Sequence, residues 1–227
     1  KEFLDFETNW ILVGTNENDE VGKTNAILID PLRKNVEKID DFKDYTNGIE
    51  ILNIPTLHTV PSCAWWIKED DKKGKFNSEL AQKNNLTREE IQLLAKGESV
   101  GKHSHLDYRD SEQTGPSVLI SGDTSGENNG FINFSKTEKE TSLLIHEATF
   151  MEENLDKAEK YLHSTAIQAA NHAKLIKAKH LIITHYSSRI KDTKYLKDEA
   201  QKEFDSVHAA SDKDVINLTS NSIEINS

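Results

Sequence analysis

A helical pattern followed by a short apolar run lies near the C-terminus. Apolar residues recur at helical spacing over 164–178, after side chains that can cap a helix, and this pattern predicts a helix. The apolar run 181–185 predicts a strand. The helix would rise roughly 22 Å and the strand would return about 17–20 Å. We therefore expect His163 and His185 to lie at the same edge of a sheet.

Short apolar runs elsewhere predict further strands. They cover 10–14, 26–30, 49–58, 63–67, 117–122, 142–147, 215–218 and 223–225. Pro55, inside the third of these runs, favours an edge position or a bulge because proline cannot donate to a central ladder. Residues 1–9 resemble the end of a helix, and the polar segment 31–48 predicts a loop or a short helix. Further helices are predicted over 152–162 and about 195–204, and a Gly- and Asn-rich loop to residue 130.

The composition changes within residues 68–110. This segment is highly charged, with nine Lys or Arg against nine Asp or Glu. Thr87 to Glu90 form a capping box that predicts the start of a short helix. We interpret 68–110 as an excursion from a core formed by 1–67 and 111–227. Together the elements predict an α/β fold.

The composition and net charge limit the kinds of molecule that the protein can bind. The 227 residues carry a net charge of −11, which repels nucleic acid and anionic membranes from most of the surface. A phosphate-bearing partner would therefore need a local basic patch or a metal ion. No long apolar run marks a membrane span or a signal peptide. The single cysteine, Cys63, excludes an internal disulfide, and we expect a soluble, cytoplasmic protein without a membrane partner.

Five side chains able to act as acids, bases or ligands follow or end predicted strands and helices: His58, Asp123, Glu147, His163 and His185. Sites in α/β sheets collect at the carboxyl ends of strands. Taken singly, each residue has a structural explanation, such as a turn aspartate or an exposed strand end. His146 alternates with inward-facing residues and is interpreted as a core histidine.

A second histidine motif, His103-Ser-His105-Leu-Asp107, has a spacing found in dinuclear metal hydrolases. It follows a polar, glycine-punctuated stretch instead of a buried strand that would fix its side chains. We therefore do not assign a metal role to it.

Four motifs in order resemble ribonuclease Z, the tRNA 3′ processing endonuclease family of the metallo-β-lactamase fold. They are Ser121-Gly-Asp-Thr124, Leu144-Ile-His-Glu-Ala-Thr-Phe150, His163-Ser-Thr165 and Thr184-His-Tyr-Ser-Ser-Arg189. Leu57 to Ser62 are similar to the family's histidine-containing strand end, and 74–98 are similar to its substrate arm. The resemblance covers nearly the whole chain from residue 50 and implies an αββα sandwich.

The resemblance also implies roles for the candidate residues. His58, Asp123 and His185 would be metal ligands, with Asp123 bridging two ions, and zinc or manganese suits such a ligand set. Two ions can activate a water and hold phosphoryl oxygens, while an oriented imidazole supplies a proton. His163 would be that catalytic imidazole, and Glu147 would orient it.

Beyond the metal site, the resemblance implies contacts with the substrate. Ser187 and Arg189 would meet a flanking phosphate, although Arg189 equally suits a surface ion pair. The implied partner is precursor tRNA, from which the enzyme would remove the 3′ trailer.

The chain also departs from the family pattern. No His-x-His-x-Asp-His loop precedes residue 50, and the arm lacks a Gly-Pro-rich tip. We therefore expect the C-terminal portion of a longer hydrolase, with the N-terminal half of the fold missing. This portion alone would have weak metal binding and little activity. If strands normally buried by the missing half are left uncovered, exposed apolar surface would make the chain aggregation-prone or dimeric. Two alternatives remain: a phosphodiesterase for cyclic nucleotides or other small substrates, and a non-catalytic partner domain.

Overall fold

The computed structural model describes residues 10–14, 20–22, 25–30, 34–40, 45–220 and 222–226. The helix end expected over 1–9 lies outside the described residues. The chain divides into two compact units, one formed by Lys1–Glu69 with Pro116–Ser227 and the other by Asp70–Gly115.

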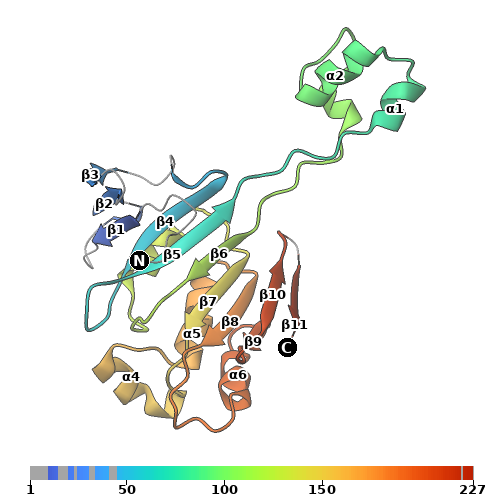
Figure 1. Ribbon diagram of the computed structural model, residues 1–227. Coiled ribbons are helices and arrows are strands. Elements are labelled where there is room, and N and C mark those ends of the chain that lie inside the picture. Colours follow the sequence, from blue (N-terminus) through green and yellow to red (C-terminus); the bar gives the residue numbers. More distant parts are fainter. Residues whose placement is uncertain are drawn as a thin grey trace. The chain divides into compact units, whose positions relative to one another are not determined.

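A mixed six-stranded sheet is the centre of the first unit (Figure 1). Its strands in spatial order are β4 (Ile49–Thr56), β5 (Ser62–Glu69), β6 (Ser117–Ile120), β7 (Leu143–Glu147), β8 (His180–Thr184) and β9 (Val207–Ala209). The strands β6 to β9 are mutually parallel, whereas β5 is antiparallel to both β4 and β6. Consequently β4 runs in the same direction as β6, and the carboxyl ends of β4, β6, β7 and β8 meet at one edge. The edge position that Pro55 favoured is confirmed, because β4 ends the sheet.

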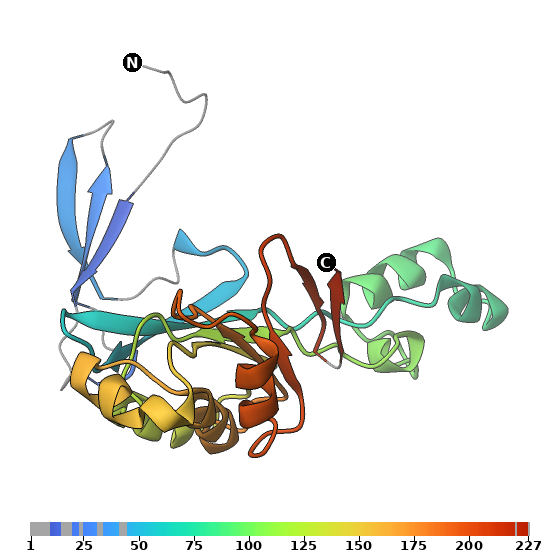
Figure 2. The same ribbon diagram turned by 90° about the horizontal axis from the view of Figure 1, so that it is seen from below.

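Helices cover one face of this sheet (Figure 2). They are α3 (Asn129–Ser135), the short 3-10 helix η3 (Glu152–Asn154), α4 (Leu155–Tyr161), α5 (Ala166–Leu175) and α6 (Lys194–Ala200). The core beneath them contains large side chains of the strands and of α3, among them Trp66, Leu119, Phe131, Phe134, Leu144 and Ile183. The predicted helices over 152–162 and 195–204 are confirmed with slightly different ends.

The helix α5 and the strand β8 confirm the pattern at the C-terminal stretch. Thr165 is the N-cap of α5 and forms a capping box with Gln168. Ser164 has another role, because its hydroxyl donates to the carbonyl of Thr124 at 2.7 Å. The buried face of α5 is made of small residues, including Ala166, Ala169, Ala170 and Ala173. These alanines let the helix backbone pack closely against β7 and β8, whose ends carry candidate site residues.

A smaller antiparallel sheet contains β1 (Trp10–Gly14), β2 (Asn25–Asp30) and β3 (Asn35–Ile39). Its buried residues pack against Ile51 and Trp65 of the large sheet. The strand β3 shows that the prediction of a loop or short helix over 31–48 was wrong at residues 35–39. Pairing with β2 places Ile39 in the core although the other side chains of β3 are exposed. Such a polar strand has little hydrophobic signal in its own sequence.

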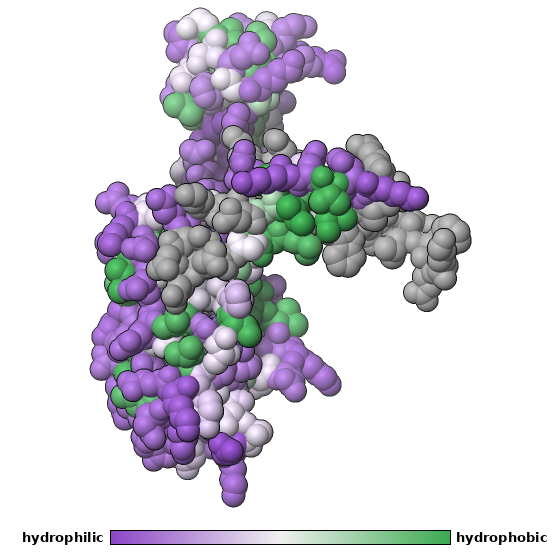
Figure 3. Space-filling model, turned by 90° about the vertical axis from the view of Figure 1, so that its left-hand side faces the viewer, coloured by the Kyte–Doolittle hydropathy of each residue, from purple (hydrophilic) through white to green (hydrophobic). Residues whose placement is uncertain are grey.

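The outer side of this small sheet exposes apolar residues. Leu12 is 51% exposed and Val36 is 61% exposed. Figure 3 shows hydrophobic side chains among hydrophilic ones on the side of the molecule that bears β1, β2 and β3. Uncovered apolar surface was the condition under which a homodimer was expected, and the homodimer stays a prediction.

The final two strands were predicted correctly. The strands β10 (Val215–Leu218) and β11 (Ile223–Asn226) form an antiparallel hairpin. The helix α3 and the strand β9 were not predicted. The first begins inside the Gly- and Asn-rich loop, capped by the side chain of Asn128, and the second is only three residues long.

The second unit has its own small core. It contains α1 (Ser78–Lys83), α2 (Arg88–Lys96) and the 3-10 helix η2 (His105–Tyr108). Ala81, Leu94 and Tyr108 are buried together. The predicted capping box of Thr87 and Glu90 is confirmed at the start of α2. The unit spans Asp70–Gly115, whereas the composition indicated 68–110, and its role as a substrate arm stays a prediction.

The layered α/β class is confirmed. The first unit has a layer of helices, the six-stranded sheet, and the smaller sheet on the other face of that sheet. These are three of the four layers expected for an αββα sandwich. Within the part of the chain that the structure describes, no helix combines the length and the apolar character needed to cross a bilayer.

Candidate active site

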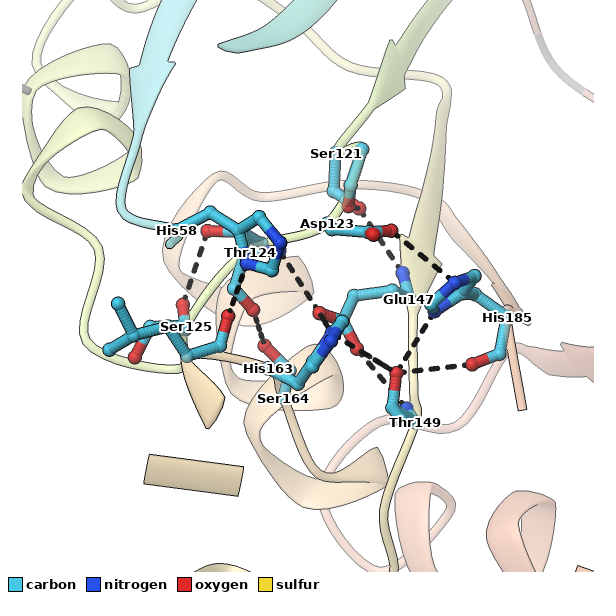
Figure 4. Close-up of polar contacts among 12 residues, drawn as sticks. His58, Ser121, Asp123, Thr124, Ser125, Glu147, Thr149, His163, Ser164 and His185 are labelled. Carbon is cyan, nitrogen blue, oxygen red and sulfur yellow. Dashed lines mark hydrogen bonds and ion pairs between the residues drawn. The ribbon is translucent and has the colours of Figure 1, made fainter. Parts of the chain in front are cut away.

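All five candidate residues meet at the shared carboxyl edge of the strands (Figure 4). His58 lies two residues beyond β4, and Asp123 lies three residues beyond β6. Glu147 ends β7, and His185 directly follows β8. His163 follows α4, where Leu162 takes a left-handed conformation with φ of 54° and ends the helix. The parallel arrangement of the strands is therefore what brings residues far apart in the sequence together.

Glu147 is a buried carboxylate with four donors around it. Its side chain is 2% exposed. One oxygen accepts the backbone N–H of Thr124 at 3.0 Å and Nδ1–H of His163 at 2.7 Å. The other accepts the backbone N–H and the hydroxyl of Thr149, at 3.2 and 2.6 Å. A buried carboxylate satisfied in this way holds the His163 ring in one orientation.

Thr149 links this carboxylate to the second histidine of the edge. Its hydroxyl oxygen lies 3.0 Å from Nδ1 of His185. Since the hydroxyl donates to Glu147, the histidine is the donor in this contact. Sequence reasoning did not single out Thr149, although it lies within the motif Leu144 to Phe150, because its importance depends on a contact across 36 residues.

The three histidines share one hydrogen-bonding arrangement. Nδ1–H of His58 donates to the carbonyl of Leu162 at 2.9 Å, as those of His163 and His185 donate to Glu147 and Thr149. With Nδ1 protonated in each neutral ring, the network assigns the lone pair to Nε2. Histidine ligands in metal sites are oriented in this way, through an oxygen that accepts the N–H of the other ring nitrogen.

Asp123 supplies a carboxylate beside these nitrogens. The preceding Gly122 has φ of +61°, a left-handed conformation that turns the chain sharply after β6. Oδ1 of Asp123 lies 3.6 Å from Nε2 of His185, and the two side chains are 39% and 51% exposed. A carboxylate oxygen and an unprotonated nitrogen facing each other at this distance suit a shared cation.

The arrangement fits metal ions, and it brings His163 into the same cluster. Ligand atoms of His58, Asp123 and His163 lie within 4.8 Å of one another, as do those of Glu147, His163 and His185. The ring of His163 lies between the others, 5.0 Å from His58 and 5.5 Å from His185 by ring centroids. The three predicted ligands are therefore divided between two groups that share His163, instead of forming one compact triad.

The two residues predicted to meet a phosphate lie just beyond β8. Ser187 is tied to the site, because its backbone N–H donates to the carbonyl of Thr149 at 3.2 Å. Arg189 is exposed in the following turn, and among the described residues its guanidinium has no carboxylate partner. The surface ion pair considered for Arg189 is therefore not formed within the described part of the chain.

Two further histidines form a buried pair next to the candidate site. His146 is fully buried, as predicted, and its Nε2 lies 2.9 Å from Nδ1 of His172. Burial lowers the pKa of His146 to about 3 and the pKa of His172 to about 4. The outer nitrogens contact the carbonyls of Glu147 and Gly126, so the pair joins the end of β7 to the loop that carries Asp123.

The residues of the other histidine motif lie in the second unit. Nδ1 of His103 is 2.6 Å from the hydroxyl of Tyr108, and Nδ1 of His105 is 3.3 Å from the hydroxyl of Ser99. These contacts belong to the packing around η2.

The edge thus combines metal-ligand chemistry with an oriented imidazole. A carboxylate and histidine nitrogens can hold cations, while His163, fixed by Glu147, can hold or transfer a proton at Nε2. Such a combination is suited to hydrolysis of a phosphate ester.

Comparison with known proteins adds a sequence relationship. No protein-family model matches the chain. Ribonuclease BN of Proteus mirabilis is 36% identical over 191 residues, which cover 79% of this chain and 60% of the relative. Ribonuclease Z of Archaeoglobus fulgidus is 33% identical over 173 residues, which cover 73% and 55%. The chain thus spans little more than half the length of these relatives.

Among solved structures, human tRNase Z, short form, is similar with a TM-score of 0.44 and 24% identity, over 82% of this chain and 46% of that one. The sequence relationship is consistent with the motifs that surround Asp123, Glu147, His163 and His185. By sequence, the chain is therefore similar to ribonucleases Z and BN over the part of their length that it spans.

Proposed function

We propose that this chain forms the catalytic edge of a metal-dependent endoribonuclease that removes the 3′ trailer of precursor tRNA. The observation that carries the proposal is the contact between His163 and Glu147, 2.7 Å long, beside Asp123 and His185. The sequence relationship to ribonucleases Z and BN supports the choice of substrate.

In this proposal His58, Asp123 and His185 hold two metal ions, and zinc suits their nitrogen and oxygen donors. Bound ions would supply an activated water and charge stabilisation at the phosphate. In this step His163 first carries a second proton, on Nε2; that proton passes to the leaving 3′ oxygen, and the neutral ring keeps its Nδ1–H on Glu147. Glu147 keeps the ring in place and stabilises the charged imidazole, while Thr149 holds His185 through its Nδ1–H.

Bound metal ions would also offset the negative charge of the protein near the substrate phosphate. A chain with net charge −11 repels RNA, whereas cations bound beside Asp123 reverse the local field at the scissile phosphate. RNA binding should therefore depend on the metal as well as on any basic surface.

The test uses the gene product that carries this chain. Stripping metal with a chelator should abolish trailer removal from a precursor tRNA, and adding zinc or manganese should restore it. Asp123→Asn should reduce cleavage at least a hundredfold. Cleavage that survives chelation would contradict the proposal.

A small phosphodiester substrate separates the proposal from its two alternatives. Bis(p-nitrophenyl) phosphate should be a far poorer substrate than precursor tRNA. Preferential hydrolysis of the small ester would instead favour a small-molecule phosphodiesterase. A protein that retains its biological function with Asp123→Asn would favour a non-catalytic partner domain.

A further inference from the structure

A cavity of about 320 Å³ lies beside the catalytic edge, within the first unit. Its walls come from the chain after β7, from η3 and the start of α4, and from the chain after β8 into α6. Ligand cavities in proteins start at roughly 300 Å³. The cavity is therefore large enough for a single nucleotide and too small for a base-paired stem.

Thr149 is part of the wall between this cavity and the proposed catalytic site. It lines the cavity, and its hydroxyl contacts Glu147 and His185. Ser187, another lining residue, is bonded to the carbonyl of Thr149. A chain of nucleotides whose phosphate lies at His163 can thus place a neighbouring nucleotide in the cavity.

Some cationic side chains at the cavity have no carboxylate partner among the described residues. Lys157, Arg189 and Lys191 line it together with two carboxylates, Glu153 and Asp192. Lys157 donates to the side chain of Asn154 at 2.6 Å, whereas among the described residues neither Arg189 nor Lys191 has a carboxylate partner. Unpaired cations at a cavity of an acidic protein indicate an anionic ligand.

The turn that carries Arg189 is fixed to the core. The backbone N–H of Ile190 donates to the carbonyl of Ser187 at 2.9 Å, and the side chain of Ile190 packs against the main core cluster. The guanidinium therefore extends from an anchored turn, which restricts where a phosphate can meet it.

Aromatic and apolar side chains form the rest of the wall. Tyr195, in the first turn of α6, is 59% exposed, and Phe150 and Met151 line the cavity across from the β8–α6 connection. An exposed aromatic ring at an otherwise polar rim is a stacking surface for a nucleobase. The cavity thus combines a phosphate-binding element with a base-binding element.

We propose that this cavity binds the single-stranded nucleotide that adjoins the scissile phosphate, with its phosphate at Arg189 and Lys191 and its base against Tyr195. The proposal rests on the proposed nuclease function for the identity of the strand, while binding of a nucleotide to the cavity can be measured without cleavage.

The experiment titrates the isolated chain, without added metal, with AMP, adenosine and inorganic phosphate, and follows binding by NMR chemical shifts. AMP should bind saturably, and at least tenfold more tightly than adenosine or phosphate alone. Arg189→Met and Tyr195→Ala should each weaken AMP binding at least fivefold. Both side chains are exposed, so the variants should fold, and circular dichroism checks this.

Matched controls come from the same unit. Tyr161 is 50% exposed at the end of α4, away from the cavity lining, and Tyr161→Ala should leave AMP binding within twofold. Lys202→Met, beyond α6 and also outside the lining, should do the same. Equal binding of AMP and free phosphate, or AMP binding insensitive to Arg189→Met and Tyr195→Ala, would overturn the proposal.

One further variant separates the two proposals. His163→Ala should abolish RNA cleavage and leave AMP binding unchanged. Normal AMP selectivity in the unsubstituted, metal-loaded protein, together with no cleavage of RNA, would support the cavity proposal and contradict the nuclease proposal. Cleavage of RNA by a protein that does not prefer AMP would support the nuclease proposal and contradict the cavity proposal.

Discussion

The carboxylate of Glu147 receives Nδ1–H of His163 at 2.7 Å, from a position that is 2% exposed. A charged acceptor at such a buried site fixes the ring and leaves its Nε2 directed into the cluster of candidate ligands.

Replacing the carboxylate by its amide tests what the pair contributes. Glu147 accepts four hydrogen bonds, and glutamine would turn an NH₂ group toward at least one of those donors. An unsatisfied buried donor costs about 1–3 kcal/mol. Glu147→Gln should therefore lower the unfolding free energy by about that amount in denaturant titration. It should also reduce cleavage at least tenfold, and unchanged stability would contradict the network.

Metal affinity distinguishes ligands from the catalytic imidazole. Ligand-atom geometry alone places His163 in both candidate groups. In our assignment, His58→Ala and His185→Ala each weaken binding of zinc at least tenfold, because each removes a ligand. His163→Ala should change affinity less than threefold. A large loss of affinity with His163→Ala would make His163 a ligand and reverse the assignment, and calorimetric titration of the metal-free protein measures all three.

The buried histidine pair predicts acid sensitivity. In the folded protein the pKa of His146 is lowered to about 3 and that of His172 to about 4, mainly by burial, from about 6.5 in the unfolded chain. The unfolded chain therefore binds more protons below about pH 6.5, so stability falls as pH is lowered from there toward 4. Each histidine should contribute a loss of about 2 kcal/mol between pH 7 and pH 5.

A variant isolates this effect from the titration of carboxylates. His172→Asn removes one of the two titrating rings, and its unfolding free energy should depend less steeply on pH between 6.5 and 4.5 than that of the wild type. Equal slopes for the two proteins would show that the folded state accepts the proton without cost.

Close packing of α5 against β7 and β8 should tolerate no enlargement. Ala170 is fully buried on the helix face that contacts these strands, and overpacking costs typically 1–3 kcal/mol. Ala170→Leu should lower the thermal midpoint, whereas Asn171→Leu, at the next and exposed position of the helix, should have little effect. Similar midpoints for the two variants would contradict close packing.

The sequence was sufficient to predict that the candidate residues lie at one edge of the sheet. It did not predict the hydrogen bonds among them. Hydrophobic runs and their ends placed His58, Asp123, Glu147 and His185 correctly, because parallel strands align their carboxyl ends. Thr149 was missed because its role depends on contacts with residues distant in sequence. The strand β3 was missed for a related reason, since pairing with β2 and not its own apolar content holds it in the sheet.

His146 and His172 are both buried, but the sequence identified only His146 as a core residue. His146 alternates with buried residues, and this periodicity identified it as a core residue. His172, on α5, had no such distinguishing pattern, and only the fold shows that it meets His146 at 2.9 Å. Side-chain pairs between a helix and a strand depend on their relative placement, which sequence periodicity does not give.

The most direct test compares two histidines that each contact a carboxylate. His163 pairs with Glu147, and His208, on β9, pairs with Asp214 at the same distance of 2.7 Å. Single-turnover cleavage of a precursor tRNA by the metal-loaded gene product should fall at least a hundredfold with His163→Ala and remain within threefold with His208→Ala. Cleavage by the His163→Ala protein at the wild-type rate would contradict the account.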